Sequence, residues 1–174
     1  MPDGKFRKKV AIVIRGPPGA GKTSLIRELE ANVSKEMTVR CLTLDHHSGA
    51  PSNHRPRNYH NMGSLSEDCV LIELGDGGDA TRNPDKWVGK LTSQGYSVHL
   101  FLLKAPLDEL RKRTSIRKDW LDGLTLGSWN SYRYDQNFIG FHKKLGLDQV
   151  EIDTTQATSS EAAEIILRSL VAVS

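Results

Sequence analysis

Long hydrophobic runs and cysteines are scarce in this sequence. No apolar segment approaches the roughly 20 residues that a membrane-spanning helix needs, so we expect no membrane partner. The basic segment 1–9 leads directly into an apolar strand, without the cleavable apolar stretch of a secretory signal. The two cysteines, Cys41 and Cys69, each fall in a predicted strand, which favours buried thiols over a disulfide or a metal site. We therefore expect a cytoplasmic protein.

The length and charge of the chain are ordinary. Its 174 residues, 37% hydrophobic and 26% charged, are typical of a soluble protein, and we expect one domain over 1–174. The formal net charge of +3 permits an anionic partner without requiring nucleic acid. We expect a monomer or a weak homodimer.

Residues 16–23, Gly-Pro-Pro-Gly-Ala-Gly-Lys-Thr, fit the phosphate-loop pattern G-x-x-x-x-G-K-[ST] at every fixed position. The apolar run 10–14 before them predicts a buried strand, and a helix over about 22–33 is predicted to follow. The apolar residues of that helix recur at helical spacing, namely Leu25, Ile26, Leu29 and Val33. A strand, a full motif and a helix in this order indicate a phosphate-binding loop rather than a chance glycine-rich turn.

The chemistry of this loop follows from its backbone and two of its side chains. N–H groups at a helix N-terminus bind the dense negative charge of a phosphate chain. Lys22 is expected to reach the β- and γ-phosphates, and the Thr23 hydroxyl is expected to bind Mg²⁺. The residues expected to hold the nucleotide are Gly16, Gly19, Ala20, Gly21, Lys22, Thr23 and Ser24.

Strands and helices are predicted to alternate along the rest of the chain. Further strands are expected at 37–44, 69–74, 96–103 and 150–152, and further helices at 84–94, at 106–113 and through Phe138, Phe141 and Leu145. The last helix, capped by Thr158 or Ser159, is expected to turn toward the core Ala162, Ile165, Ile166 and either Leu170 or Val171. This alternation predicts an α/β fold, with helices on both faces of a parallel sheet and ligands at the carboxyl ends of its strands.

Signatures of two other nucleotide-hydrolysing classes are missing from the sequence. There is no Asn-Lys-x-Asp, the motif with which GTPases read guanine. The third predicted strand ends in Glu73 and Leu74, rather than in the acidic pair usual for a motor ATPase. Glu73 is interpreted either as a residue that holds Mg²⁺ through water or as a buried or turn-bonded carboxylate. The missing motifs argue against both classes, and three features described next favour a small kinase.

Two positions outside the loop suit phosphoryl transfer. Asp45 ends the second predicted strand, where it would orient an acceptor hydroxyl and take its proton late, or would merely cap a polar turn. Arg113 and Arg117 lie four residues apart on one helical face. They would neutralise the separating phosphates, or would form a solvated basic helix end.

The segment Ile152-Asp153-Thr154-Thr155 completes a recognisable pattern with the phosphate loop, Asp45 and the two arginines. With these features the sequence resembles the phage-type polynucleotide kinase and zeta-toxin branch of P-loop kinases, and more distantly gluconate and adenylylsulfate kinases. The resemblance implies a three-layer P-loop fold whose five-stranded parallel sheet has the order 2-3-1-4-5, with ATP as donor. It also implies that Asp45 is the acceptor-side base and that Thr154 and Thr155 lie beside the adenine.

The resemblance further implies a lid over about residues 113–133, in which Arg113 and Arg117 act as lid arginines. Four aromatic residues alternate with basic residues in this segment and directly after it, namely Trp120, Trp129, Tyr132 and Tyr134. Packing of the lid against the core is favoured as their role over a base-stacking surface.

The acceptor side departs from polynucleotide kinases in two places. Those enzymes usually carry Asp followed by Thr and Asn in the turn after strand three, whereas the turn around Asp76 is longer and richer in glycine. They also carry an arginine a few residues after the base, whereas the nearest ones here are Arg55 and Arg57. We expect Asp76, Arg55 and Arg57 to contact the acceptor, with a plain solvated loop as the alternative for the arginines. The four histidines between His46 and His60 match no standard zinc spacing.

The sequence therefore predicts a kinase that uses ATP and Mg²⁺ to phosphorylate a hydroxyl. A nucleotide or nucleic-acid hydroxyl is favoured as acceptor, either a 5′ end or a hydroxylated base. The alternatives are a kinase for a small metabolite, sugar or sugar-nucleotide, and a regulatory switch that hydrolyses nucleotide slowly.

Overall fold

The computed structural model describes residues 8–17, 19–44, 62–75, 79–116 and 140–172. Five parallel strands form one sheet in the order β2-β3-β1-β4-β5. Their bounds are β1 Val10–Arg15, β2 Val39–Leu44, β3 Cys69–Leu74, β4 Ser97–Lys104 and β5 Gln149–Asp153. Both the parallel pairing and the strand order confirm the expected fold.

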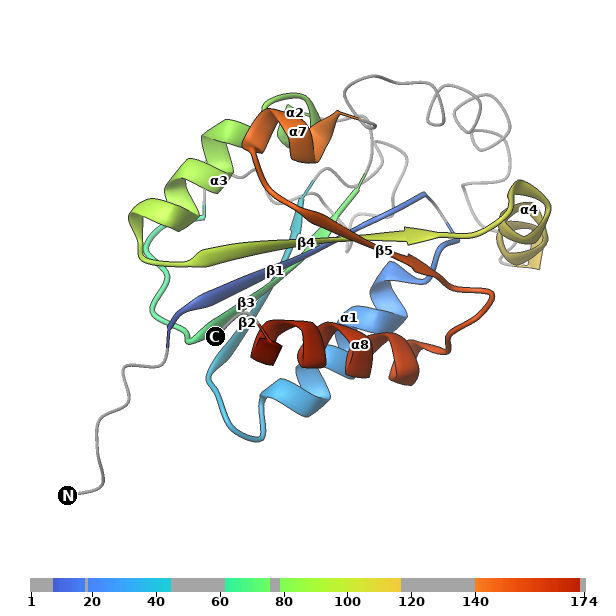
Figure 1. Ribbon diagram of the computed structural model, residues 1–174, viewed down its shortest axis with the longest axis horizontal. Coiled ribbons are helices and arrows are strands. Elements are labelled where there is room, and N and C mark those ends of the chain that lie inside the picture. Colours follow the sequence, from blue (N-terminus) through green and yellow to red (C-terminus); the bar gives the residue numbers. More distant parts are fainter. Residues whose placement is uncertain (1–7, 18, 45–61, 76–78, 117–139, 173–174) are drawn as a thin grey trace.

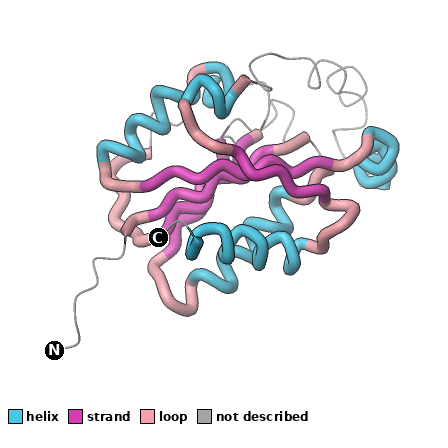
Figure 2. The backbone as a smooth tube through the Cα atoms, in the orientation of Figure 1, coloured by secondary structure: helices cyan, strands magenta, loops and turns pink. Residues whose placement is uncertain are grey.

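Helices cover both faces of this sheet (Figures 1 and 2). On one face lie α1 (Lys22–Val33) and α8 (Ser159–Ala172), and on the other α2 (Asp79–Arg82), α3 (Pro84–Ser93) and α7 (Phe141–Leu145). The remaining described helix, α4 (Leu107–Ile116), lies beyond the carboxyl end of β4. Among the described residues, no helix is long and apolar enough to cross a membrane.

The strand register brings several carboxyl ends to one edge of the sheet. Arg15, the last residue of β1, pairs with Leu74 of β3 and Leu102 of β4. Leu44, the last residue of β2, pairs with the same Leu74, and the Gly75 N–H donates to the Leu44 carbonyl at 2.7 Å. The segments that follow β1, β2 and β3 therefore all begin at the edge where parallel sheets bind ligands.

One hydrophobic core lies on each face of the sheet, and alternate residues of β1 belong to one or the other. Ala11 and Val13 belong to the core beneath α3 and α7, whereas Ile12 and Ile14 belong to the core beneath α1 and α8. The four apolar residues predicted for the first helix are all buried in the second core, namely Leu25, Ile26, Leu29 and Val33. The strand interpretation of 10–14 and the helix interpretation of 22–33 are both confirmed.

The interpretation of the last helix was partly wrong. Ala162 and Ile166 face the core as expected, but Ile165 is 44% exposed and Val171 is 76% exposed. Ala163 is buried in place of Ile165, and Leu170 is partly buried against the same core. The face of α8 turned toward the core of α1 therefore contains Ala162, Ala163 and Ile166, and Ile165 lies outside it.

Element ends differ modestly from the prediction where side chains compete for the backbone. Residue 37 was expected to begin the second strand, but the Met37 N–H still bonds the Val33 carbonyl at the end of α1. The Thr38 N–H donates to the Asp68 carboxylate at 2.9 Å, so β2 starts only at Val39. The short α2 was not predicted, and Phe138, expected in the helix before β5, lies outside the described residues.

Both cysteines are free thiols in strands, as predicted. Cys69 is buried in β3 and Cys41 is half-buried in β2. Burial raises the pKa of Cys69 to about 12 and that of Cys41 to about 11, so both are protonated at neutral pH.

Candidate functional site

The phosphate loop connects β1 to α1 at the carboxyl edge of the sheet. Gly16 lies so close to β4 that a Cβ there would sit 2.8 Å from the Leu103 carbonyl oxygen. Gly19 and Gly21 have φ angles of 81° and 96°, which residues with a side chain rarely adopt. Close approach at one position and a left-handed backbone at two others account for these glycines.

The first turn of α1 offers donors to an anion. Gly21 is its N-cap residue and has no side chain that could cap the helix, and this turn, described in full, contains no acidic residue. Its N–H groups point back toward the loop, and the positive end of the helix dipole lies there too. The arrangement suits a phosphate group.

The Lys22 side chain folds back onto the first residues of the phosphate loop. Its Nζ donates to the Gly16 carbonyl at 2.8 Å and to the Pro17 carbonyl at 3.2 Å. The ammonium group is therefore held by the first two carbonyls of the loop. A phosphate oxygen is a stronger acceptor than these carbonyls and would compete for the same protons.

Thr23 and Glu73 bring together two elements that are 50 residues apart. The Thr23 hydroxyl donates to Glu73 Oε1 at 2.7 Å, linking the start of α1 to the end of β3. A hydroxyl and a carboxylate are oxygen ligands of the kind that Mg²⁺ prefers, so this pair fits that ion. Glu73 therefore lies beside the residue that the sequence predicts as a metal ligand, Thr23.

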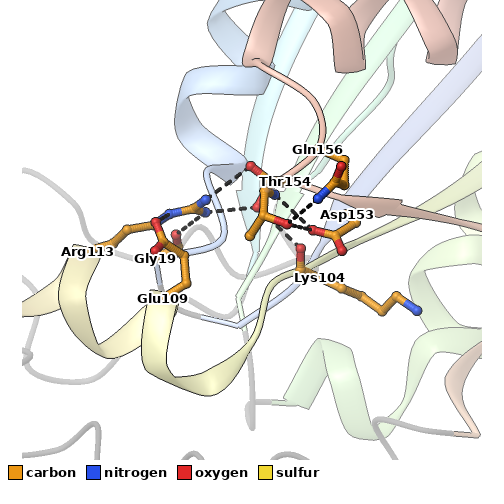
Figure 3. A network of polar contacts seen from close by, with 8 residues as sticks. Gly19, Lys104, Glu109, Arg113, Asp153, Thr154 and Gln156 are labelled. Atoms are coloured by element: carbon orange, nitrogen blue, oxygen red, sulfur yellow. Dashed lines mark hydrogen bonds and ion pairs between the residues drawn. The ribbon is translucent and has the colours of Figure 1, made fainter.

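Arg113 of α4 joins the phosphate loop to the turn after β5 (Figure 3). Its Nη1 donates to the Gly19 carbonyl at 3.3 Å and to Thr154 Oγ1 at 2.8 Å, and its Nη2 donates to the Thr154 carbonyl at 3.1 Å. Glu109, one turn earlier in α4, pairs with its Nε at 3.0 Å. The guanidinium is thus held in a fixed orientation beside the loop.

The turn after β5 is shaped by Asp153. Its carboxylate accepts from the Thr155 N–H at 2.8 Å and from the Thr155 hydroxyl at 2.6 Å. These bonds favour the ionised carboxylate, so the pKa of Asp153 lies below its ordinary value, and the charges of Lys104 and Arg113 add to this effect. Thr155 itself is exposed at the surface of the turn.

The structure brings most of the described candidate residues to one edge of the sheet. Glu73 lies on the β3 side of the phosphate loop, and Arg113 with Thr154 lies on the side of β4 and β5. Outside the described residues lie Asp45, Arg55, Arg57, Asp76 and Arg117, together with residues 117–133 of the expected lid. The described part of the candidate site is therefore the part expected to hold the nucleotide, and the residues expected to contact the acceptor lie outside it.

One residue at this edge was missed by the sequence interpretation. Arg15 ends β1 immediately before the loop, yet only 1% of it is exposed. The sequence offered one signal. Arg15 stands directly between an apolar strand and Gly16, and the two-residue period of a strand puts it on the same face as the buried Ala11 and Val13.

Comparison with known proteins gives similarities of structure only. No protein-family model matches this chain, and no curated protein matches it in sequence. YorR from Bacillus subtilis, solved with phosphorylated GDP, is similar with a TM-score of 0.59 at 14% identity, covering 92% of this chain and 95% of that one.

Two further solved structures are similar over nearly their whole length. The tunicamycin resistance protein of Deinococcus radiodurans has a TM-score of 0.57 at 23% identity, covering 93% of this chain and 95% of its own. Shikimate kinase from Acinetobacter baumannii, solved with shikimate, has a TM-score of 0.56 at 20% identity, covering 96% of each chain. Together with the strand order, these similarities show that the chain has the fold of P-loop kinases.

Proposed function

We propose that this protein is a kinase that transfers the γ-phosphate of ATP, with Mg²⁺, to a hydroxyl group. The observation that carries the proposal is the hydrogen bond between Thr23 and Glu73 beside a complete phosphate loop. It joins the expected metal ligand to an acidic strand end, as a site for a phosphate-bound metal requires. Bound Mg²⁺ would neutralise charge that develops on the phosphates.

The positions of the described groups support one orientation of the nucleotide. Thr23 and Glu73 mark the β- and γ-phosphate end, and they lie on the β3 side of the loop. The base would extend the other way, toward Thr154 and Thr155 after β5. The γ-phosphate then points toward the end of β2, where Asp45 follows Leu44 in the chain.

The chemistry assigned to the chain is mainly positioning and charge neutralisation. Lys22 and the loop N–H groups hold the phosphates, while Arg113 and Arg117 neutralise charge as the γ-phosphate leaves. Asp45 orients the acceptor hydroxyl and accepts its proton late in the transfer. The lid over about 113–133 would close over the nucleotide within a single domain spanning 1–174.

We favour a nucleotide or nucleic-acid hydroxyl as the acceptor. The resemblance to polynucleotide kinases supports this class, as do Arg55 and Arg57 in the chain and the exposed Arg111 and Lys112 of α4. An acceptor that is a small metabolite is the second candidate, because shikimate kinase, which shares the fold, was solved with shikimate. In either case we propose a cytoplasmic protein that is a monomer or a weak homodimer.

The proposal is tested by incubating the protein with γ-labelled ATP, Mg²⁺ and separate pools of acceptors. The pools are 5′-hydroxyl oligonucleotides, oligonucleotides with hydroxymethylated bases, nucleosides, sugars and sugar-nucleotides, with Lys22→Ala as the control. We expect label on one of the two oligonucleotide pools or on the nucleosides, and none with Lys22→Ala. Label on a sugar pool would support the second candidate, whereas label found only as free phosphate would support a hydrolysing switch.

A further inference from the structure

Arg15 is a charged side chain in the interior of the molecule. It follows Ala11 and Val13 on the face of β1 that is covered by α3 and α7, and only 1% of its surface is exposed. Taking a guanidinium group out of water is unfavourable unless the surroundings hold it by specific contacts. The contacts of Arg15 therefore bear on why an arginine stands immediately before the phosphate loop.

Two of those contacts come from elements distant in the chain. The guanidinium carbon lies 4.3 Å from the centre of the Phe141 ring, and Nη1 donates to Gln149 Oε1 at 2.8 Å. Phe141 is the first residue of α7, and Gln149 is the first residue of β5. One side chain thus ties the end of the central strand to both elements.

The ring that receives the guanidinium is itself held in place. Phe141 is fully buried, and its ring centre lies 6.1 Å from that of Trp87 in α3. The indole N–H of Trp87 donates to the Ala80 carbonyl of α2 at 2.8 Å. Arg15 is therefore anchored to a packed layer of the fold rather than to a single side chain.

The backbone of Arg15 continues directly into the phosphate loop. Gly16 follows Arg15 directly and packs against the Leu103 carbonyl, and its own carbonyl accepts the Lys22 ammonium at 2.8 Å. A shift of the Arg15 backbone would move the Gly16 carbonyl and with it the resting place of Lys22. The loop is thus connected to the buried layer through two consecutive residues.

We propose that Arg15 is a positioning residue for nucleotide binding, which sets the Gly16 carbonyl and hence places Lys22 for the β-phosphate. The inference rests on the proposed function, because it needs a nucleotide in the phosphate loop. Lys22 acts on the β- and γ-phosphates, so Arg15 should affect a ligand with a β-phosphate more than one without it.

The test is calorimetric titration of the full chain with Mg²⁺ and either ADP or AMP. The variants are Arg15→Met, Arg15→Lys and Phe141→Leu, and Arg40→Met serves as the matched control. Arg40 lies in β2 and pairs with Glu67 at 3.4 Å. β2 is the edge strand opposite to β5, which contains Gln149. Circular dichroism establishes that each variant is folded, and Lys22→Ala establishes that ADP binds in the loop.

We expect Arg15→Met to weaken ADP binding about tenfold while AMP binding changes less than about twofold. Arg15→Lys should recover most of the ADP affinity, because an ammonium can still contact the ring and donate to Gln149. Arg40→Met should leave both affinities unchanged. A general loosening of the fold would instead weaken ADP and AMP binding together, and that result would overturn the proposal.

The remaining outcomes separate a failure of the positioning role of Arg15 from a failure of the proposed function. If Lys22→Ala abolishes ADP binding but Arg15→Met leaves it unchanged, the positioning role is wrong and the proposed function stands. If the wild-type chain binds no ADP, both fall. If Arg15→Met does not fold, Phe141→Leu carries the test, and an unchanged ratio of ADP to AMP affinity in that variant overturns the proposal.

Discussion

At the scale of single residues, Arg113 shows how the structure refines a sequence-based role. The sequence predicted a lid arginine that meets the phosphates. The described contacts place its guanidinium against the Gly19 carbonyl and against Thr154, on the β5 side of the loop. These contacts connect the loop to the turn that is proposed to lie beside the base, whereas the predicted contact with the phosphates remains a proposal.

This role predicts a clear difference between two neighbouring arginines of α4. Arg113→Met should weaken MgADP binding about tenfold or more, because hydrogen bonds from a charged donor contribute about 1.5–3 kcal/mol each. Arg111→Met is the matched control, since Arg111 pairs with the highly exposed Asp108 at 3.9 Å and should change binding by less than about twofold. Calorimetry of both variants measures the effect, and equal affinities would contradict the assigned role.

The pairing of Thr23 with Glu73 predicts a metal-specific effect at the same scale. Glu73→Gln can still accept the Thr23 hydrogen bond but removes the negative charge that would attract Mg²⁺. We expect the Mg²⁺ concentration for half-maximal ATP binding to rise about tenfold, with metal-free ATP binding little changed. The control is Glu164→Gln, which alters an exposed ion pair of α8, and a Mg²⁺ dependence equal to that of this control would rule out the metal role.

At the scale of elements, periodicity was a good guide wherever one face packs against the sheet. The apolar spacing of α1 and the unbroken run of β1 were sufficient to predict both elements and their buried residues. On α8 both Ile165 and Ile166 were expected to face the core because they are equivalent in hydrophobicity, but only Ile166 is buried. Such a choice depends on packing against α1, which local sequence does not specify.

The two isoleucines of α8 provide a matched test of that packing. Ile166→Ala should lower the free energy of unfolding by about 2–5 kcal/mol, because Ile166 is fully buried and its removal leaves a cavity. Ile165→Ala should change it by less than about 1 kcal/mol, since that side chain already contacts water. Urea unfolding measures both values, and a larger loss for Ile165→Ala would show that the assigned face is wrong.

At the scale of the whole molecule, the described site is assembled from segments that lie far apart in the chain. The bond between Arg113 and Thr154 spans 41 residues, and that between Thr23 and Glu73 spans 50. The sequence predicted the strand order through resemblance and the loop through its motif. It did not predict Arg15, because the apolar pattern identifies the strand through Ile14 and says nothing of a charged residue that turns inward after it.

Phosphoryl transfer to an acceptor, rather than hydrolysis of the nucleotide alone, is the reaction that Asp45 is proposed to serve. Wild type is compared with Asp45→Asn by measuring, in parallel, ATP turnover, ATP affinity and label transfer from γ-labelled ATP to the acceptor pools described above. Since a positioned base contributes about 10²–10⁴-fold, we expect transfer to fall at least about a hundredfold, with ATP affinity within about twofold of wild type. Unchanged nucleotide turnover in Asp45→Asn, with no acceptor labelled by either protein, would contradict the account.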